Sequence, residues 1–406
     1  MFLHFSVDKY KTRFPDLTNF IIKIFILTLR MKYFITFLSI LVFITMLSSC
    51  SSTSGIDYNS IKVADSDASI QTKKLYRRIS EISKKGIAFG HQDATAYGIG
   101  WKHEVGSSGL RSDIKEVAGD LPAVHGFDIG HIELSRSINL DTVSFSLMKD
   151  LIKHLNAKGA IITMSWHLDN PVTNGDSWDT TTTVVPAILK GGTYRKKYEL
   201  WIKRLSVFLN SIRDKENKVI PIVFRPYHEM NGSWFWWGAS HCSPEEYKQL
   251  WIETQQLLQE NGVHNLLYAY SPNTLASEED FETYYPGDAY VDILGVDIYN
   301  HGGNEEFTQN VKYNLEILKK KASINNKPYT LSESGNVNFG LDANWWTQTL
   351  YPGIKDSGIA WVLFWRNANP SHYFSTYKGE ISEEDFIEFS QMDEILFLEE
   401  IKNITN

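Results

Sequence analysis

Cysteine is scarce in this sequence, with Cys50 and Cys242 the only two in 406 residues. Two thiols cannot build a disulfide scaffold. Clusters of lysine and arginine are also missing, and 40 basic against 48 acidic residues leave a net charge of −8. We therefore expect no nucleic-acid partner. The hydrophobic content of 43% excludes a disordered chain, and the length suits one large barrel or two ordinary domains.

The N-terminal segment has the pattern of a signal peptide. From Met31, one lysine precedes an uncharged run over 33–47, which ends in the residues Leu-Ser-Ser-Cys at Cys50. The run is shorter than the ~20 residues that a membrane span needs, although a transmembrane anchor is the alternative. The ending resembles a bacterial lipobox, which implies that Cys50 is acylated and becomes the mature N-terminus. Residues 1–30 lie upstream of what looks like the natural start.

These features divide the chain into three parts. We expect a signal region over 1–50, a polar tether over 51–69 and one folded domain over 70–406. The membrane would be a partner only through the lipid anchor. The residues after Cys50 lack an early acidic cluster, so the periplasmic side of the cell envelope is favoured over the cell surface.

Eight short apolar runs, rich in β-branched and aromatic residues, recur after residue 70, and the segments between them are mostly amphipathic helices. The runs cover 86–92, 121–129, 159–167, 219–229, 265–272, 291–299, 327–335 and 359–367. Continuous apolar runs are typical of parallel strands that are covered on both faces. Clear helices are predicted over 141–159 and 243–262, and a last helix over roughly 382–403 would close the ring. The pattern predicts a single (β/α)8 TIM barrel, with a doubly wound sheet as the alternative.

Polar and aromatic side chains gather where these predicted strands end, which is where barrel active sites lie. Glu229 directly ends the fourth run and Glu333 follows the apolar part of the seventh. Strands four and seven lie across an eight-stranded barrel, so the two carboxyl groups can converge over its mouth. Two carboxyl groups on either side of a bond are what glycoside hydrolysis requires. The alternative is that each glutamate merely pairs with an arginine such as Arg225 or Arg366.

Tryptophan is the residue in excess, with 12 in the chain. Three of them follow Glu229 in the run Ser-Trp-Phe-Trp-Trp-Gly over 233–238, and Trp178 and Trp365 also lie in strand-end segments. Flat aromatic rings hold sugars, although they also serve as core. As a group, these tryptophans indicate a carbohydrate ligand.

The segment Arg-Pro-Tyr-His-Glu-Met-Asn-Gly-Ser-Trp-Phe-Trp-Trp-Gly over 225–238 resembles the acid/base motif of glycoside hydrolase family 26, the β-mannanases. The segment Leu-Ser-Glu-Ser-Gly-Asn over 331–336 resembles the nucleophile motif of that family. The resemblance extends from residue 90 to residue 368. It implies a retaining hydrolase of β-1,4-mannosidic linkages in mannan, galactomannan or glucomannan, without a metal or other cofactor and most simply as a monomer.

Carried over residue by residue, the resemblance implies that Glu229 is the general acid/base and Glu333 the nucleophile. The substrate-contacting positions would be His167, Trp178, His228, Trp234, Tyr299, Trp365 and Arg366. Arg366 and Tyr299 would keep Glu333 ionised, and nearby tryptophan and the charge of Glu333 would raise the pKa of Glu229.

Several alternatives stay open. A metal hydrolase is suggested by His91, His125, His131, His167 and His228, although the first strand lacks the His-x-His pattern of such barrels. A non-catalytic glycan-binding lipoprotein would keep the tryptophans and could dispense with either glutamate. Within the family, xylan or β-glucan is the other substrate class. Whether the enzyme cuts inside the chain or releases mannobiose from an end depends on the strand-end loops, the longest of which covers 168–192.

Overall fold

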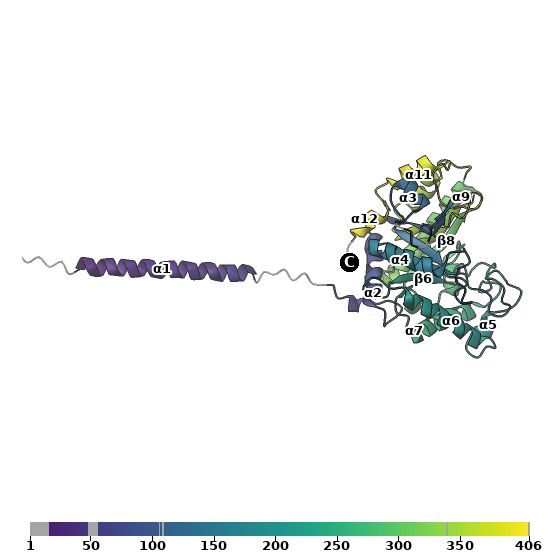
Figure 1. Ribbon diagram of the computed structural model, residues 1–406, viewed down its shortest axis with the longest axis horizontal. Coiled ribbons are helices and arrows are strands. Elements are labelled where there is room, and N and C mark those ends of the chain that lie inside the picture. The colour runs from purple at the N-terminus through teal and green to yellow at the C-terminus, as the bar shows by residue number, and fades with distance from the viewer. Residues whose placement is uncertain (1–15, 48–55, 105, 108, 338–339, 405–406) are drawn as a thin grey trace, which may run out of the picture. The chain divides into compact units, whose positions relative to one another are not determined.

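The computed structural model describes residues 16–47, 56–104, 106–107, 109–337 and 340–404. The chain forms two units, Met1–Asp57 and Tyr58–Asn406. In the first unit, helix α1 runs from Asp16 to Leu47 and includes the apolar run of the predicted signal region (Figure 1). Within the described ranges, no helix combines the length and the hydropathy that a membrane crossing needs. Residues 48–50 of the predicted lipobox, Cys50 among them, lie outside the described residues.

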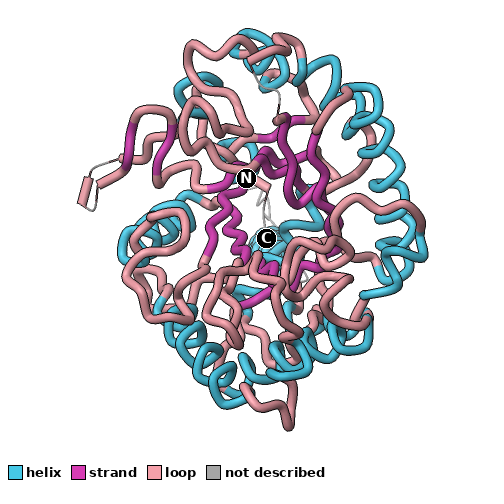
Figure 2. Tube along the Cα trace, turned by 90° about the vertical axis from the view of Figure 1, so that its right-hand side faces the viewer, coloured by secondary structure: helices cyan, strands magenta, loops and turns pink. Residues whose placement is uncertain are grey.

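The second unit is a closed barrel of parallel strands. In the described part of the chain, its eight strands are β1 (Ile87–Gln92), β4 (Val124–Asp128), β5 (Ile161–Trp166), β6 (Ile222–Pro226), β7 (Leu266–Tyr270), β8 (Ile293–Asn300), β9 (Tyr329–Asn336) and β10 (Trp361–Phe364). They pair in this order, and β10 pairs with β1 to close the ring. Figure 2 shows the strands as a ring enclosed by helices. The predicted (β/α)8 barrel and its eight strands are confirmed.

Helices alternate with these strands along the chain. They are α2 (Ile70–Ile82), α3 (Asp113–Ala118), α4 (Phe145–Lys158), α5 (Val185–Ile188), α6 (Arg195–Ser211), α7 (Pro244–Glu260), α8 (Glu278–Tyr284), α9 (Asn304–Asn325), α10 (Tyr351–Ile354), α11 (Glu383–Ser390) and α12 (Leu398–Lys402). Single helical turns lie at η1 (Tyr58–Ser60), η2 (Asp288–Tyr290) and η3 (Trp346–Leu350), and a small hairpin joins β2 (Tyr97–Gly98) to β3 (Trp101–Lys102).

The signals that predicted α7 are present as interactions. Ser243 accepts a hydrogen bond from the backbone N–H of Glu246, whose carboxylate accepts one from the N–H of Ser243, which forms a capping box. The chain leaves the helix at Gly262, where φ is +74°. Because a side chain at positive φ is strained, glycine suits this position.

Two predicted boundaries differ from the structure. The barrel unit begins at Tyr58, within the predicted tether, because Asp292 accepts a hydrogen bond from the N–H of Ala64 and His264 accepts one from the N–H of Ser69. The predicted last helix over 382–403 is wrong as a single element. It breaks into α11 and α12, between which strand β11 (Ile395–Leu396) pairs with β1 and buries both of its side chains.

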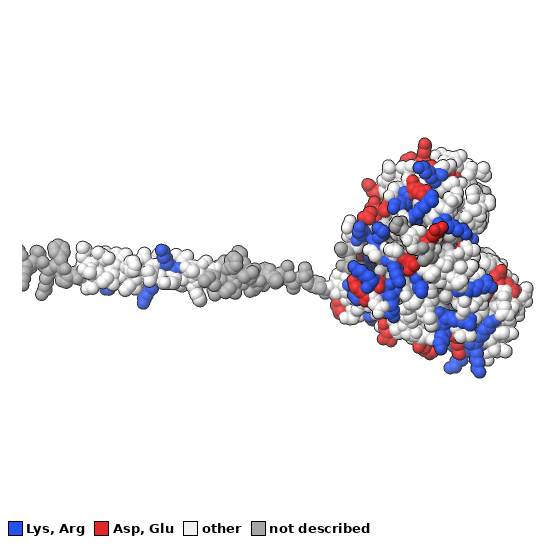
Figure 3. Space-filling view, in the orientation of Figure 1, with Lys and Arg blue, Asp and Glu red and all other residues white. Residues whose placement is uncertain are grey.

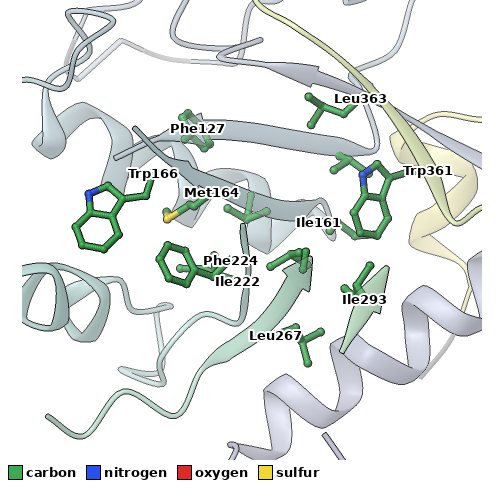
Figure 4. Packing of buried hydrophobic residues seen from close by; sticks show 14 of the residues in the cluster. Phe127, Ile161, Met164, Trp166, Ile222, Phe224, Leu267, Ile293, Trp361 and Leu363 are labelled. Carbon is green, nitrogen blue, oxygen red and sulfur yellow. The ribbon is translucent and has the colours of Figure 1, made fainter. Parts of the chain in front are cut away.

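The interior of the barrel unit is apolar. Side chains from β4, β5, β6, β7, β8 and β10 pack together in Figure 4, and the ten that are labelled there are all buried. Burying this surface is the main stabilising contribution to the fold. Rigid packing of the strand bodies also determines where the polar side chains at the strand ends point.

Candidate active site

A cavity of about 640 Å³ opens at the carboxyl ends of the barrel strands. Every residue that the sequence predicts as catalytic or sugar-contacting lines it. The lining residues are Leu140, Asp141, His167, Trp178, His228, Glu229, Trp234, Phe235, Asn273, Tyr299, His301, Glu333, Val337, Trp365, Arg366, His372 and Phe374. The structure thus brings together residues that are up to 234 positions apart in sequence, from Leu140 to Phe374, into one site for a small ligand or a segment of a polymer.

Glu229 lies just beyond β6, in a backbone conformation that is rare for a residue with a side chain. Its φ is +55°, and Tyr227, two residues before it, has a φ of +48°. The backbone is held there because the N–H of Glu229 donates to the carbonyl of Ser271 at 2.8 Å and its carbonyl accepts from the N–H of Gly232 at 2.9 Å. Strained backbone that neighbouring contacts hold in place is a frequent property of functional sites.

The carboxyl group of Glu229 is nearly buried and accepts two hydrogen bonds. Trp234 donates its indole N–H to Oε2 at 2.8 Å, and Asn273 donates its amide to Oε1 at 3.1 Å. Burial and the charge of Glu333 raise the pKa of Glu229 to about 7, although both donors oppose the increase. The predicted rise in the pKa of Glu229 agrees with this environment.

Glu333, on β9, has a different environment. Its Oε1 accepts a hydrogen bond from the hydroxyl of Tyr299 at 2.7 Å, and its Oε2 accepts one from Nη2 of Arg225. Arg225 also donates through Nη1 to Asp297 at 2.6 Å. Each oxygen of the Glu333 carboxylate thus accepts a hydrogen bond, and the one from the guanidinium is of the stronger, charge-assisted kind.

Arg366 does not contact Glu333, which corrects one expectation. Its Nη2 forms an ion pair with Asp141 at 3.0 Å, and its Nη1 donates to the hydroxyl of Tyr97 at 3.3 Å. The sequence could not distinguish the two arginines because each comes directly after several apolar residues of a predicted strand. Arg225 contacts Glu333 because it points inward from β6, whereas Arg366 lies beyond β10 at the rim of the cavity.

A chain of polar side chains borders the site on the side of β4 and β5. Nδ1 of His167 lies 2.7 Å from Oδ2 of Asp128. On the other side of the same ring, Nε2 of His167 lies 3.2 Å from Nε2 of His228. Burial lowers the pKa of His167, but the Asp128 carboxylate outweighs it and the pKa is raised. Burial, Arg225 and His167 hold the pKa of His228 well below its usual value. The pair therefore presents a neutral imidazole, His228, beside one that favours a proton.

The tryptophans near the site differ in how far their rings are exposed. Trp178 and Trp234 are 48% and 39% exposed, and Trp178 stacks on the His167 ring with centroids 5.4 Å apart. Trp236 and Trp237 are completely buried and pack edge to face with each other. Of the tryptophans that the sequence groups around a carbohydrate, these two take the alternative role, because the loop after Trp234 turns inward and uses them as core.

Sequence analysis missed several lining residues. Asn273 stands at a predicted strand end but was given no role, and Asp141 lies at the start of a predicted helix. His301, His372 and Phe374 lie in loops, where no periodic pattern marks a side chain that points into a cavity. Asn273 could have been found from its position, because it directly follows the fifth predicted run just as Glu229 stands at the end of the fourth.

The remaining histidines have other surroundings. His91 and His125 are buried side by side on paired strands, and burial lowers the pKa of each to about 3. His131 lies 3.7 Å from Asp169. Among the residues that the structure describes, no group of three or more His, Cys, Asp or Glu side chains is arranged to hold a metal ion.

A (β/α)8 barrel with two carboxyl groups and exposed tryptophans around a cavity at its mouth is the arrangement of a glycoside hydrolase. The family model described as glycosyl hydrolase family 26 matches residues 64–336. The chain belongs to this family, as the sequence motifs predicted.

Relatives and solved structures agree with this assignment. A mannan endo-1,4-β-mannosidase of Bifidobacterium adolescentis is 30% identical over 363 residues, which are 83% of this chain and 36% of that protein. A protein of the same name from Bacillus subtilis is 30% identical over 58% of this chain and 64% of its own length. The chain thus spans about one third and two thirds of the length of these two relatives.

Among solved structures, a GH26 β-mannanase from Bacteroides ovatus is 43% identical with a TM-score of 0.78, covering 82% of this chain and 97% of that one. The catalytic domain of a GH26 endo-β-1,4-mannanase from Bacillus sp. JAMB-750 is 31% identical with a TM-score of 0.79, covering 85% and 96%. The similarity therefore covers the barrel as a whole and nearly all of each solved chain.

Proposed function

We propose that this protein is a retaining hydrolase of β-1,4-mannosidic linkages, with Glu229 as the general acid/base and Glu333 as the nucleophile. The observation that carries the proposal is the contrast between two carboxyl groups in one cavity. Burial and Glu333 raise the pKa of Glu229 to about 7, while Glu333 contacts the guanidinium of Arg225. One carboxyl group is thus suited to donate a proton and the other to attack as an anion.

The substrate class is supported by the names of the relatives. The matched proteins of Bifidobacterium adolescentis and Bacillus subtilis are mannan endo-1,4-β-mannosidases, and the matched structure from Bacteroides ovatus is a β-mannanase. A neutral polysaccharide needs no electrostatic attraction. On the face of the barrel unit seen in Figure 3, basic and acidic side chains are interspersed, which agrees with such a substrate.

In the first step, the Glu333 carboxylate attacks the anomeric carbon of the sugar as the bond from that carbon to the glycosidic oxygen breaks. Protonated Glu229 gives its proton to the departing oxygen, which leaves as the hydroxyl of the next sugar. The products are a covalent glycosyl ester on Glu333 and an ionised Glu229.

In the second step, water attacks the same carbon. Ionised Glu229 takes a proton from the water as the ester bond to Glu333 breaks, and Glu333 leaves as a carboxylate. Two inversions restore the original anomeric configuration. Tyr299 and Arg225, which hydrogen-bond Glu333, stabilise the carboxylate before attack and after release.

The other predicted residues would bind sugar rings around the point of cleavage. Trp178 and Trp234 offer exposed faces, and Trp365 lies edge to face with His167 at 5.9 Å. His167 and His228 offer ring nitrogens to sugar hydroxyls. Arg366, fixed by Asp141, would donate from the rim of the cavity.

The test is hydrolysis of a manno-oligosaccharide, with proton NMR used to follow the anomeric configuration of the first product. We expect the β-anomer to appear first and then mutarotate. We expect Glu333→Ala to abolish turnover and Glu229→Ala to lower kcat/KM on mannan by about 10²–10⁴-fold. An α-anomer as first product, or full activity of Glu333→Ala, would contradict the mechanism. A protein that binds mannan without cleaving it would instead be a glycan-binding lipoprotein.

A β-glucan is the second candidate substrate. The relative named endoglucanase H from Acetivibrio thermocellus is 28% identical over 36% of this chain. Parallel assays on mannan, galactomannan, xylan and mixed-linkage glucan distinguish the two classes. The size distribution of early products from long mannan, either a ladder of oligomers or mannobiose alone, shows whether cleavage is internal.

We also propose that the enzyme is anchored in the cell envelope through a lipid on Cys50, with the periplasmic side favoured. The support is the sequence pattern alone, a lysine and an uncharged run followed by Leu-Ser-Ser-Cys. Mass spectrometry of the mature N-terminus checks it. Full-length protein should partition with membranes and carry an acylated Cys50, whereas Cys50→Ala should not be acylated.

A further inference from the structure

Two side chains share the hydrogen-bonding capacity of Glu229, one for each carboxyl oxygen. Trp234 comes from the same loop as Glu229 and donates to Oε2 at 2.8 Å. Asn273 comes from a different segment, the one that follows β7, and donates to Oε1 at 3.1 Å. Both carboxyl oxygens are thus held from opposite sides, so the plane of the carboxyl group is fixed.

Asn273 is itself held by a second asparagine. Its backbone N–H donates to Oδ1 of Asn231 at 2.8 Å, and the amide of Asn231 donates back to the carbonyl oxygens of Asn273 at 3.1 Å and Thr274 at 3.3 Å. We name this reciprocal contact of Asn231 with the 273–274 backbone the asparagine clasp. It ties the loop that carries Glu229 to the end of β7.

We propose that Asn273, held by the asparagine clasp, is a positioning residue that orients the carboxyl group of Glu229 for proton transfer. The inference rests on the proposed function, because it assigns a partner to the proposed acid/base. It goes beyond that function by placing one of the residues that control the reaction in the segment after β7, which carries neither glutamate.

The chemistry of the contact determines what Asn273 does. An amide N–H stabilises the ionised form of a carboxyl group more than the protonated form, so it lowers the pKa that burial and Glu333 raise. The contact with Asn273 also stabilises the ionised Glu229 that must act as the general base in the second step. Without the donor, Glu229 would keep its proton to higher pH and would be free to rotate.

The test compares Asn273→Ala, Asn273→Asp and Asn231→Ala with the wild-type enzyme on mannan across pH. For Asn273→Ala, we expect kcat/KM to fall about tenfold and its basic limb to move up by roughly 0.5–1 pH. Asn273→Asp places a carboxylate beside Glu229, so its basic limb should move further up. Asn231→Ala should show a smaller change of the same sign. Asn325→Ala, which removes an exposed amide on α9 that bonds Asp288, is the matched control and should match the wild type.

A second substrate separates positioning from other roles. An aryl β-mannobioside with an acidic phenol needs little protonation of its leaving group, so Asn273→Ala should lower kcat/KM on this substrate less than on mannan. A purely structural defect would lower both equally and would appear in the melting temperature. Loss of mannan activity with an unchanged basic limb would make Asn273 a binder of the leaving sugar, which overturns the proposal.

The two proposals fail in different ways. If the wild-type enzyme hydrolyses none of the glycans, the proposed function fails. If it is active, Glu229→Ala shows the expected loss of kcat/KM on mannan and all three asparagine variants keep the wild-type pH profile, only the role of Asn273 fails.

Discussion

Arg225 on β6 donates a hydrogen bond to the carboxylate of Glu333 on β9, and both side chains are buried. The same guanidinium donates to Asp297 at 2.6 Å, so one cation serves two buried carboxylates. Such a site is stable only while all partners are present, because an unpaired charge in the interior loses its hydration without compensation.

Replacing Arg225 should therefore destabilise the fold as well as the chemistry. We expect Arg225→Met to lower the free energy of unfolding by about 3–5 kcal/mol, measured by urea denaturation. Lys84→Met, which breaks the exposed pair with Glu81, should cost less than about 1 kcal/mol. Equal losses of unfolding free energy for the two variants would show that the buried ion pair contributes no more to stability than the exposed one.

The pH dependence of activity should follow Glu229. A pKa raised to about 7 means that the proton needed for the first step is present below that pH and is lost as pH rises through it. We expect kcat/KM on mannan to decrease above about pH 7. For an aryl mannobioside with an acidic leaving group, this decrease of kcat/KM above pH 7 should become smaller. An unchanged decrease would mean that a group other than Glu229 causes it.

A substitution at Gly232 should disturb the hydrogen bond from Trp234 to Glu229 without changing either of those two residues. A Cβ at this position would lie 2.3 Å from the ring of Trp234, so Gly232→Ala must displace the indole that donates to Glu229. We expect kcat/KM to fall about ten- to a hundredfold while the melting temperature changes little. Gly302→Ala, which has no atom within 4 Å of its Cβ, is the matched control. Wild-type activity of Gly232→Ala would mean that the indole contact is dispensable.

Two tryptophans should respond in opposite ways to the same substitution. Trp178→Ala removes an exposed ring that stacks on His167, so KM for manno-oligosaccharides should rise several-fold with little loss of stability. Trp236→Ala empties a fully buried site and should cost about 3–5 kcal/mol. Steady-state kinetics and urea denaturation on both variants check this. Loss of stability in Trp178→Ala would make that residue core.

The strands and the two glutamates could be predicted because each depends on local sequence. An apolar run of β-branched residues is buried wherever it lies in a barrel, and a carboxyl group directly after such a run must reach the mouth. The position of Glu229 after β6 and of Glu333 on β9 follows from this rule alone.

The errors arose where the outcome depends on distant parts of the chain. Trp236 is core because Leu168, from another loop, accepts its indole N–H at 3.2 Å, and nothing near 236 shows this. The predicted last helix breaks because β11 finds a partner in β1, more than 300 positions earlier. Helical periodicity has no information about such a partner.

The pairing of β1 with both β10 and β11 has a consequence for how the chain is made. The first strand of the barrel finds these neighbours only after the last strands have left the ribosome, so ring closure waits for the end of synthesis. Until then β1 has one open edge, and β4 is its only barrel neighbour among the described strands. A nascent or prematurely terminated chain would thus expose an apolar strand edge, which makes aggregation the expected fate of truncated copies.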